Sequence, residues 1–278
     1  MAKINNFVID HVIRGVMTKK DGTYMWSINQ ITNPSLNVTL TDTAQAVDAL
    51  GSPIAEFDRG RSAEFGAENS IFDLGLYAAQ LGNEVEEGGA TDKDGKVIKI
   101  ETPAFEEVEV TDATTYELKN VPINEIETIY VLNGDGTLGT AYKAATDASN
   151  TEFVYDKDTH TITLPTLYDK DTNPDGTLKV GDTLFVMYEY IAESGTAVTA
   201  DGVNFPKKGR FVMEVLGADV CNQDELIHAY VIFPNAKLDG NVDYSFTTDG
   251  THPFTIKALQ DYCDSKKKLF TIVIPEEA

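Results

Sequence analysis

The stretch SLNVTLTDTAQAVDALGSPIAEFDRGRSAEFGAENSIFDLGLYAAQLG, residues 35–82, decides the fold of this chain. Residues 35–41 alternate apolar and polar side chains with a period of two, and residues 62–68 do so again. That period is typical of half-buried strands. Residues 42–61, between the two patterns, are expected to form a long loop. The stretch therefore predicts strand, long loop and strand.

A short helix is expected directly after the second of these strands. Ser70 is a suitable N-cap, and Asp73 three residues later completes a capping-box arrangement. Apolar residues follow at positions 74, 78 and 81, and Gly82 stands where a C′ glycine is common. Because the helix is short and apolar on one side, we expect it to cover a sheet.

Both ends of the chain are patterned as strands. Residues 4–17 and 24–30 predict a hairpin that turns at residues 20–22, and later strands are predicted over residues 209–216, 226–233, 242–248 and 269–274. A second helix is expected from His252 and Pro253 onwards, because Ile256, Leu259 and residues 262–263 are spaced helically. The chain is thus expected to be mainly β, with one or two short helices.

The middle of the chain differs from its flanks in charge and in spacing. Residues 101–193 hold 19 Asp and Glu against 5 Lys, a net of −14 out of −23 for the whole chain. Short strand-like pieces alternate there with turn signals such as Asn133-Gly-Asp-Gly136, which favours a small β-module. We expect residues 104–192 to form an inserted acidic β-domain, and residues 1–103 with 193–278 to form one discontinuous β-domain.

Composition narrows the class of protein. The net charge of −23 argues against a protein that grips nucleic-acid phosphates, because such affinity comes mainly from Lys and Arg. No apolar run approaches the length of a membrane span, and the first residues have no signal-peptide pattern. Cys221 and Cys263 make no disulfide framework, so we expect two reduced, partly buried thiols in a protein folded in a cytoplasm.

One segment has the spacing of a calcium-binding loop. It is DTNPDGTLKVGD, residues 171–182, with Gly176 at position 6. A short Asp replaces the usual bidentate Glu at the last position, and strand-like sequence flanks the loop, so a plain turn is the alternative. If calcium is bound, the oxygen ligands are expected to come from Asp171, Asn173, Asp175, Thr177 and Asp182.

No catalytic signature is present in the sequence. The four histidines form no His-x-x-x-His pair, and there is no Gly-x-Ser-x-Gly elbow, P-loop or Gly-x-Gly-x-x-Gly after a strand. A paired-carboxylate glycosidase stays formally open, but two nearby acids carry no information among 45. We therefore expect no enzyme and no cofactor other than the calcium considered above.

The chain resembles the tail tube (major tail) proteins of bacteriophages. The resemblance is carried by residues 35–82 and by the late segments GRFVMEVLGADV, ELIHAYVIFPNAKLDGNVDYSF and KKLFTIVIP. A pair of strands that closes a tube ring is expected from residues 226–233, a corner at residues 234–237 and the strand that follows. The resemblance covers both flanks and not the acidic insertion, which looks like a surface-decorating module.

The resemblance implies a tail-tube-like β-sandwich or barrel that forms hexameric rings. The rings would stack with each other and with other tail proteins, and double-stranded DNA would pass through the tube without specific binding. The protein would be made in the host cytoplasm and belong to the virion tail. The loop at residues 42–61 is expected to reach a neighbouring ring, with inter-subunit contacts from Asp48, Glu56, Asp58, Arg59 and Arg61.

Two other functions remain open at this point. A phage capsid decoration protein would be a nearby structural alternative. A calcium-stabilised β-sandwich that serves as a binding or adhesin module would instead need the loop at residues 171–182 to hold a metal. A hydrolase ranks last, because no residue of the sequence is marked as a nucleophile.

Overall fold

The computed structural model describes residues 6–92, 94–261 and 267–275. They form two compact units, Met1–Val85 with Val198–Ala278 (the discontinuous unit) and Glu86–Ala197 (the inserted unit). Strands dominate both units, so the predicted mainly β fold is confirmed. The inserted unit is wider than the expected residues 104–192, because a short strand pair closes its base.

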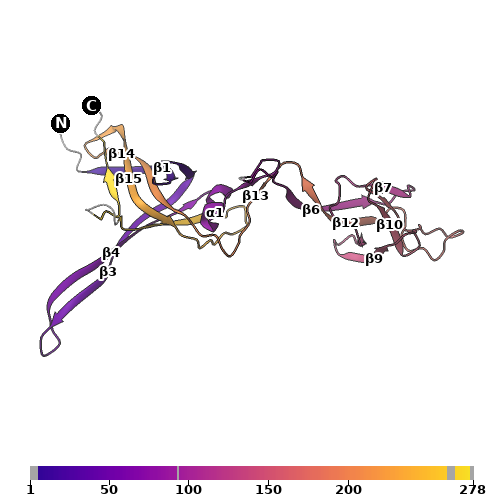
Figure 1. Ribbon diagram of the computed structural model, residues 1–278, viewed down its shortest axis with the longest axis horizontal. Coiled ribbons are helices and arrows are strands. Elements are labelled where there is room, and N and C mark those ends of the chain that lie inside the picture. The colour runs from indigo at the N-terminus through magenta and orange to yellow at the C-terminus, as the bar shows by residue number, and fades with distance from the viewer. Residues whose placement is uncertain (1–5, 93, 262–266, 276–278) are drawn as a thin grey trace. The chain divides into compact units, whose positions relative to one another are not determined.

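One large antiparallel sheet builds the discontinuous unit (Figure 1). Its strand order is β2-β1-β14-β15-β16-β4-β3, and β17 pairs with β15. The strands are β1 (Phe7–Thr18), β2 (Tyr24–Ile28), β3 (Ile31–Val47), β4 (Pro53–Asn69), β14 (Lys208–Asp219), β15 (Asn222–Leu238), β16 (His252–Ala258) and β17 (Thr271–Val273).

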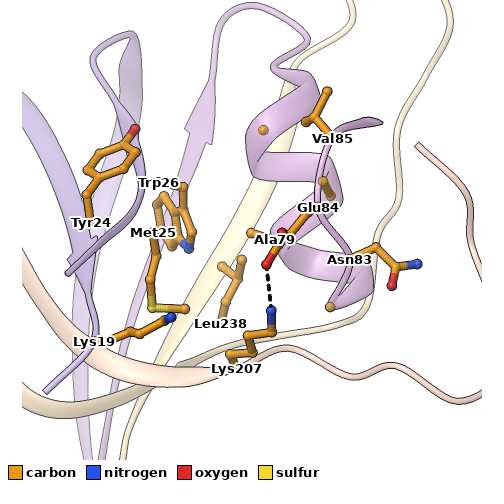
Figure 2. A pocket seen from close by; sticks show the side chains of 13 residues that line it. Lys19, Tyr24, Met25, Trp26, Ala79, Asn83, Glu84, Val85, Lys207 and Leu238 are labelled. Carbon is orange, nitrogen blue, oxygen red and sulfur yellow. Dashed lines mark hydrogen bonds and ion pairs between the residues drawn. The ribbon is translucent and has the colours of Figure 1, made fainter. Parts of the chain in front are cut away.

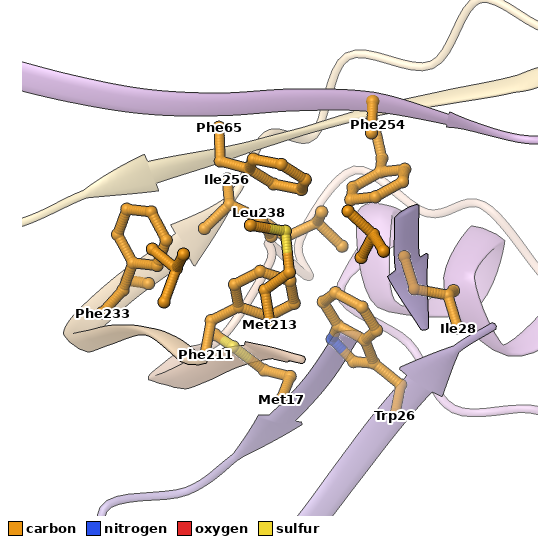
Figure 3. Packing of buried hydrophobic residues seen from close by; sticks show 14 of the residues in the cluster. Met17, Trp26, Ile28, Phe65, Phe211, Met213, Phe233, Leu238, Phe254 and Ile256 are labelled. Carbon is orange, nitrogen blue, oxygen red and sulfur yellow. The ribbon is translucent and has the colours of Figure 1, made fainter. Parts of the chain in front are cut away.

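The core of this unit lies on one face of the curved sheet. Figure 3 shows the rings of Trp26, Phe65, Phe211 and Phe254 gathered with Met213 between the strands. Phe211 is central, with its ring 5.8 Å from Trp26 and 6.0 Å from Phe65. Each such side chain contributes about 1.5 to 3 kcal/mol when it is fully buried. The core therefore ties the early strands to the late ones.

The helix α1 (Leu74–Leu81) begins later than the sequence predicts. Its N-cap is Asp73, whose carboxylate accepts the N–H of Leu76 at 2.7 Å, so the prediction of Ser70 as N-cap is wrong. Residues up to Asn69 are still paired in the sheet, which delays the helix. At the other end, Gly82 adopts the expected left-handed conformation with φ 85°.

Three other predictions in this unit are wrong. Residues 252–258 form β16 and not a helix, because Phe254 and Ile256 alternate into the core with a period of two. Residues 242–248 form no strand, since the Tyr244 ring packs 4.8 Å from Phe72 instead of standing on a ladder. The expected corner at residues 234–237 lies inside the continuous strand β15, at a register shift where the sheet accommodates Pro234.

The inserted unit has a sheet and a core of its own. Its strand order is β6-β12-β8-β9-β10-β11-β7, and buried residues such as Tyr142, Phe153 and Leu184 fill it. The strands are β6 (Ile100–Glu109), β7 (Thr115–Glu117), β8 (Thr128–Leu132), β9 (Leu138–Ala144), β10 (Glu152–Asp156), β11 (Thr161–Thr163) and β12 (Thr183–Ala192). The pair β5 (Glu86–Glu87) and β13 (Thr196–Ala197) closes the base of the unit.

Candidate assembly interface

The segment that the sequence predicts as a loop is a two-stranded arm. Strands β3 and β4 remain paired up to Val47 and Pro53, so residues 42–61 (the arm) are a β-hairpin. Strand β16 accompanies β4 only over residues 64–69, and the arm runs on beyond it (Figure 1). A two-stranded ribbon is only marginally stable by itself. Contact with another chain would therefore stabilise the arm.

Apolar side chains share one face of the arm around Phe57, and Ile54, at the register shift, adds an exposed apolar side chain on the side of Glu56. Ala44 pairs with Phe57 and Ala46 with Ala55, whereas the alternate pair Gln45 and Glu56 lies on the other face. The side chains of Ile54 and Phe57 are 68% and 58% exposed, and Leu50 in the turn is 92% exposed. Such a concentration of exposed large apolar side chains on one hairpin indicates an interaction surface.

The turn at the tip of the arm is shaped by Asp48. Its Oδ1 accepts the N–H groups of Leu50 and Ser52, both at 2.8 Å, and Gly51 takes the left-handed conformation with φ 85°. Asp48 thus holds the turn that presents Leu50. This role within the chain was not visible in the sequence, where Asp48 was expected only as an inter-subunit contact.

The four other predicted contact residues all lie on β4 in the arm. Glu56 accepts a hydrogen bond from Gln45 at 3.4 Å, and Asp58 pairs in register with Thr43. Arg59 sits at a register shift of the hairpin, and Arg61 lies opposite Leu40. Within the described part of the chain, neither arginine forms an ion pair. Their expected role between subunits stays a prediction.

Both edges of the large sheet are open. Within the described residues, β2 ends the strand order on one side and β3 on the other, so each leaves a row of backbone N–H and C=O groups without a sheet partner. Open edges are templates for pairing with another chain. The described part of the discontinuous unit therefore has two free edge strands, β2 and β3, which an edge-to-edge assembly requires.

A polar face of the sheet lies opposite the core on β1, β14 and β15. Glu214 accepts from Arg14 Nε at 2.6 Å and contacts His228 Nδ1 at 2.9 Å, and these three side chains come from three adjacent strands. The Glu214 side chain is only 15% exposed. This carboxylate balances the cationic Arg14, so the face offers mixed charge.

The predicted calcium loop, residues 171–182, lies in the inserted unit. Several of its side chains form hydrogen bonds within the chain. The Asn173 amide donates to Asn150 Oδ1 and Leu167 O, and Asp182 accepts the N–H of Lys179 at 2.8 Å. Thr177 Oγ1 lies 2.9 Å from the Tyr142 hydroxyl. In the part of the chain that the structure describes, no three or more His, Cys, Asp or Glu residues are grouped to hold a metal. Asp171 and Asp175 complete the proposed ligand set, which stays a prediction.

The sequence did not single out Glu106, a buried carboxylate in the core of the inserted unit. Its Oε1 accepts from the Tyr188 hydroxyl and from the N–H of Lys119 at 2.9 Å, and Tyr116 lies 3.5 Å from Oε2. Burial and the hydrogen bond of Tyr188 to Glu106 raise the pKa of Tyr188 to about 12. The alternation of β6 would have marked the inward position of Glu106, since Ala104 and Val108 flank it on the same face.

The opposite face of this sheet exposes aromatic and apolar side chains. Phe105 pairs with Met187 across β6 and β12, and both are more than half exposed. The Phe185 ring is nearly parallel to that of Phe105, with centroids 5.8 Å apart. Glu107 and Glu189 lie exposed on the same strands and face. The face is thus apolar in its middle and acidic around it.

Two smaller expectations concern cysteine and the membrane. Cys221 is exposed in the turn between β14 and β15, so the expectation of a partly buried thiol is wrong there. Cys263 lies outside the described residues. Among the helices of the described chain, none has the length and apolar character that crossing a bilayer requires.

These features define the class of the protein as a mainly β structural subunit with surfaces for assembly. The chain belongs to the YomU/Tube protein family, whose model matches residues 7–272. The resemblance to phage tail tube proteins is thereby confirmed, and the chain is a tube protein of the virion. The family model also spans the inserted unit. No curated protein matches the chain.

Proposed function

We propose that this chain is the tail tube subunit of a phage, that six copies close into a ring, and that the rings stack into a conduit for double-stranded DNA. Membership of the tube family supports the class of function. The observation that carries the assembly is the arm, because its exposed apolar face has no cover within the described part of the chain. Burial of such a face on another copy removes it from water.

Ring closure is expected to use the open edges of the large sheet. Antiparallel or parallel pairing of β2 of one copy with β3 of the next would satisfy the unpaired backbone groups of β2 and of the part of the longer β3 that lies beside it. A closed ring leaves no free edge, which explains how a sheet with two open edges avoids uncontrolled aggregation. The arm is then left to contact the neighbouring ring.

The polar face on β1, β14 and β15 is our candidate for the inner surface of the conduit. The ion pair of Arg14 with Glu214 prevents the arginine from acting as an unbalanced cation toward DNA phosphates. Arg210 lies exposed on the same face, so the face itself has mixed charge, and only the chain as a whole is strongly acidic. Net acidity of the subunit opposes tight binding of a polyanion. No base-reading contacts are required for this role.

The experiment is electron microscopy of the purified chain and of virions. We expect rings or tubes in negative stain, with six subunits per ring in class averages, and labelling of tails rather than heads by an antibody against the chain. Labelling of heads would favour the capsid decoration alternative. A strictly monomeric chain, even at high concentration and with other tail proteins present, would contradict the proposal.

A further inference from the structure

The discontinuous unit contains a cavity that the assembly described so far does not use. A cavity of about 420 Å³ lies between β2 and α1. Figure 2 shows Met25, Trp26, Ala79 and Leu238 around it, with Lys19 and Lys207 at its side. Trp26 and Leu238 are buried members of the core, so the cavity reaches down to the core itself. It is large enough to admit apolar side chains from outside.

Two lysines and one glutamate, Lys19, Lys207 and Glu84, are the charged residues that line the cavity. Lys19 and Lys207 are both exposed, and Lys207 Nζ lies 3.1 Å from Glu84 Oε1. Lys20, the next residue after Lys19, is paired instead with Asp261, whose Oδ1 lies 3.5 Å from Lys20 Nζ. An apolar cavity with cations beside it favours an occupant that is apolar at its tip and acidic around it. That combination is uncommon on a surface.

The arm has this combination. The arm, residues 42–61, holds four acids against Arg59 and Arg61, a net of −2, and both arginines lie at the end of the arm away from its tip. Leu50 stands at the tip and, at 92%, is the most exposed large apolar side chain among the described residues. Ile54 follows it on β4 and is 68% exposed. The arm tip therefore matches the cavity both in hydrophobicity and in the sign of its charge.

An apolar surface on the inserted unit is a poorer match for the arm. The face around Phe105 and Met187 is flanked by Glu107 and Glu189, and the inserted unit holds 23 Asp and Glu against 8 Lys. Approach of an acidic arm to that face brings like charges together, which opposes binding. The arm and the cavity attract, whereas the arm and the acidic face repel.

We infer that the arm tip of one copy docks in the cavity of a second copy, with Leu50 entering between Trp26, Ala79 and Leu238. The inference rests on the proposed tube assembly, which supplies the second copy. It gives the arm a defined receptor and gives the lysines beside the cavity a function in the contact. Docking also buries the apolar face that the free arm exposes.

Site-directed crosslinking tests this contact. In a background with Cys221→Ser and Cys263→Ser, the pair Leu50→Cys and Ala79→Cys is treated with a short bismaleimide in assembled protein. We expect a ladder of covalent oligomers on a denaturing gel, about tenfold stronger than in the matched control pair Leu50→Cys and Val220→Cys. Val220 lies exposed in the turn between β14 and β15, away from the cavity lining.

A second set of variants tests the same contact without crosslinking. Ala79→Trp fills the cavity and is expected to reduce tube formation at least about tenfold. Lys19→Glu and Glu56→Lys should each weaken assembly, and their combination should restore it if the two charges meet. The rescue distinguishes a lost contact from a damaged fold, because two independent folding defects would not cancel.

The outcomes separate this inference from the proposed function. Tubes that form normally in Ala79→Trp and give no excess of the residue 50–79 crosslink would overturn the docking while leaving the tube subunit intact. An unmodified chain that remains monomeric under all conditions would overturn both. A specific crosslink with charge rescue would support the docking.

Discussion

His252 is a buried histidine with only one satisfied ring nitrogen. Nε2 lies 2.6 Å from Gln80 Oε1, and the amide nitrogen of Gln80 donates to Pro253 O, so the proton of the neutral ring must be on Nε2. Nδ1 has no hydrogen-bond partner in the described structure, and the Phe72 ring stacks 5.5 Å away. A second proton on Nδ1 would therefore be buried without an acceptor.

This histidine predicts acid sensitivity of the discontinuous unit. Burial lowers the pKa of His252 below its ordinary 6.5, although Asp73 opposes the shift. The unfolded chain then takes up the proton first, so the contribution of His252 to the free energy of unfolding is full above pH 6.5 and falls as the pH drops. The slope from one such proton is at most about 1.4 kcal/mol per pH unit. Urea melts between pH 7.5 and 5 measure it.

The control for this prediction is the exposed His11. His11→Gln should leave the acid slope unchanged, because the His11 side chain is 57% exposed and its substitution removes no buried group. His252→Gln should flatten the slope, whatever its effect on stability at neutral pH. Equal slopes in the unmodified chain and in His252→Gln would rule out His252 as the source.

Tyr188 predicts the opposite, alkaline behaviour in the inserted unit. Its pKa is raised from 10 to about 12 by burial and by the Glu106 carboxylate. The stabilisation is fully present below pH 10 and is lost as the pH rises through 12, with a loss of the order of 2 kcal/mol. Tyr188→Phe should lower stability at pH 7 and remove most of this alkaline step. Near-ultraviolet titration of the folded inserted unit reads the tyrosinate directly, and an ordinary pKa for residue 188 would refute the argument.

At the scale of elements, the arm exposes large apolar side chains although its two strands are paired. Because Ile54 and Phe57 are more than half exposed, Ile54→Ser with Phe57→Ser should change the free energy of unfolding by no more than about 0.5 kcal/mol per site. Their loss from an assembled interface should weaken association at least about tenfold, since burial of one such side chain contributes 1.5 to 3 kcal/mol, or about a factor of ten or more. Urea melts measure the free energy of unfolding, and sedimentation velocity measures the association.

The matched control uses polar side chains of the same hairpin. Thr43→Ser and Gln45→Ser alter side chains of the two-stranded ribbon that carry little apolar area. We expect their assembly to match that of the unmodified chain. Equal weakening by both pairs of substitutions would mean that the arm acts through its fold and not through its apolar face.

The arm also shows what the sequence could predict and what it could not. The alternation over residues 35–41 and 62–68 predicted the strands correctly. Core packing imposes it on Phe65 and Ala67 and in part on Leu36, whereas Val38 and Leu40 are exposed. Beyond these, register shifts interrupt the period of two, and no further strand covers the ribbon to impose burial. A pattern that records burial cannot reveal a ribbon that the described chain leaves uncovered.

The same reasoning explains the misplaced helices. The sequence predicts Ser70 as the N-cap and Asp73 as the acid three residues later, whereas pairing of residues up to Asn69 moves the cap to Asp73. At residues 252–258, the spacing of Ile256 and Leu259 suggested a helix, whereas Phe254 and Ile256 record the strand. The cavity beside α1 was beyond sequence reasoning, because its lining comes from segments more than 200 residues apart.

At the scale of the whole molecule, charge and connectivity separate the two units. The inserted unit carries a net of −15 and the discontinuous unit −8, from 22 Asp and Glu against 14 Lys and Arg. The excess acid therefore lies mostly outside the sheet that bears the arm and the cavity. Net charge alone is accordingly weak support for an acidic conduit, and the assembly surfaces carry the proposal.

The connection between the units predicts that the inserted unit can be removed. Glu86 pairs with Ala197 across β5 and β13, so the two chain crossings lie side by side. A short Gly-Ser linker from Val85 to Val198 should therefore close without strain. The shortened chain keeps the core around Phe211, the arm and the cavity, so we expect cooperative unfolding and tubes in negative stain.

The separate 86–197 unit, with its own core, should fold as a monomer. Failure of the shortened chain to form tubes, despite a cooperative melt, would show that the inserted unit takes part in assembly.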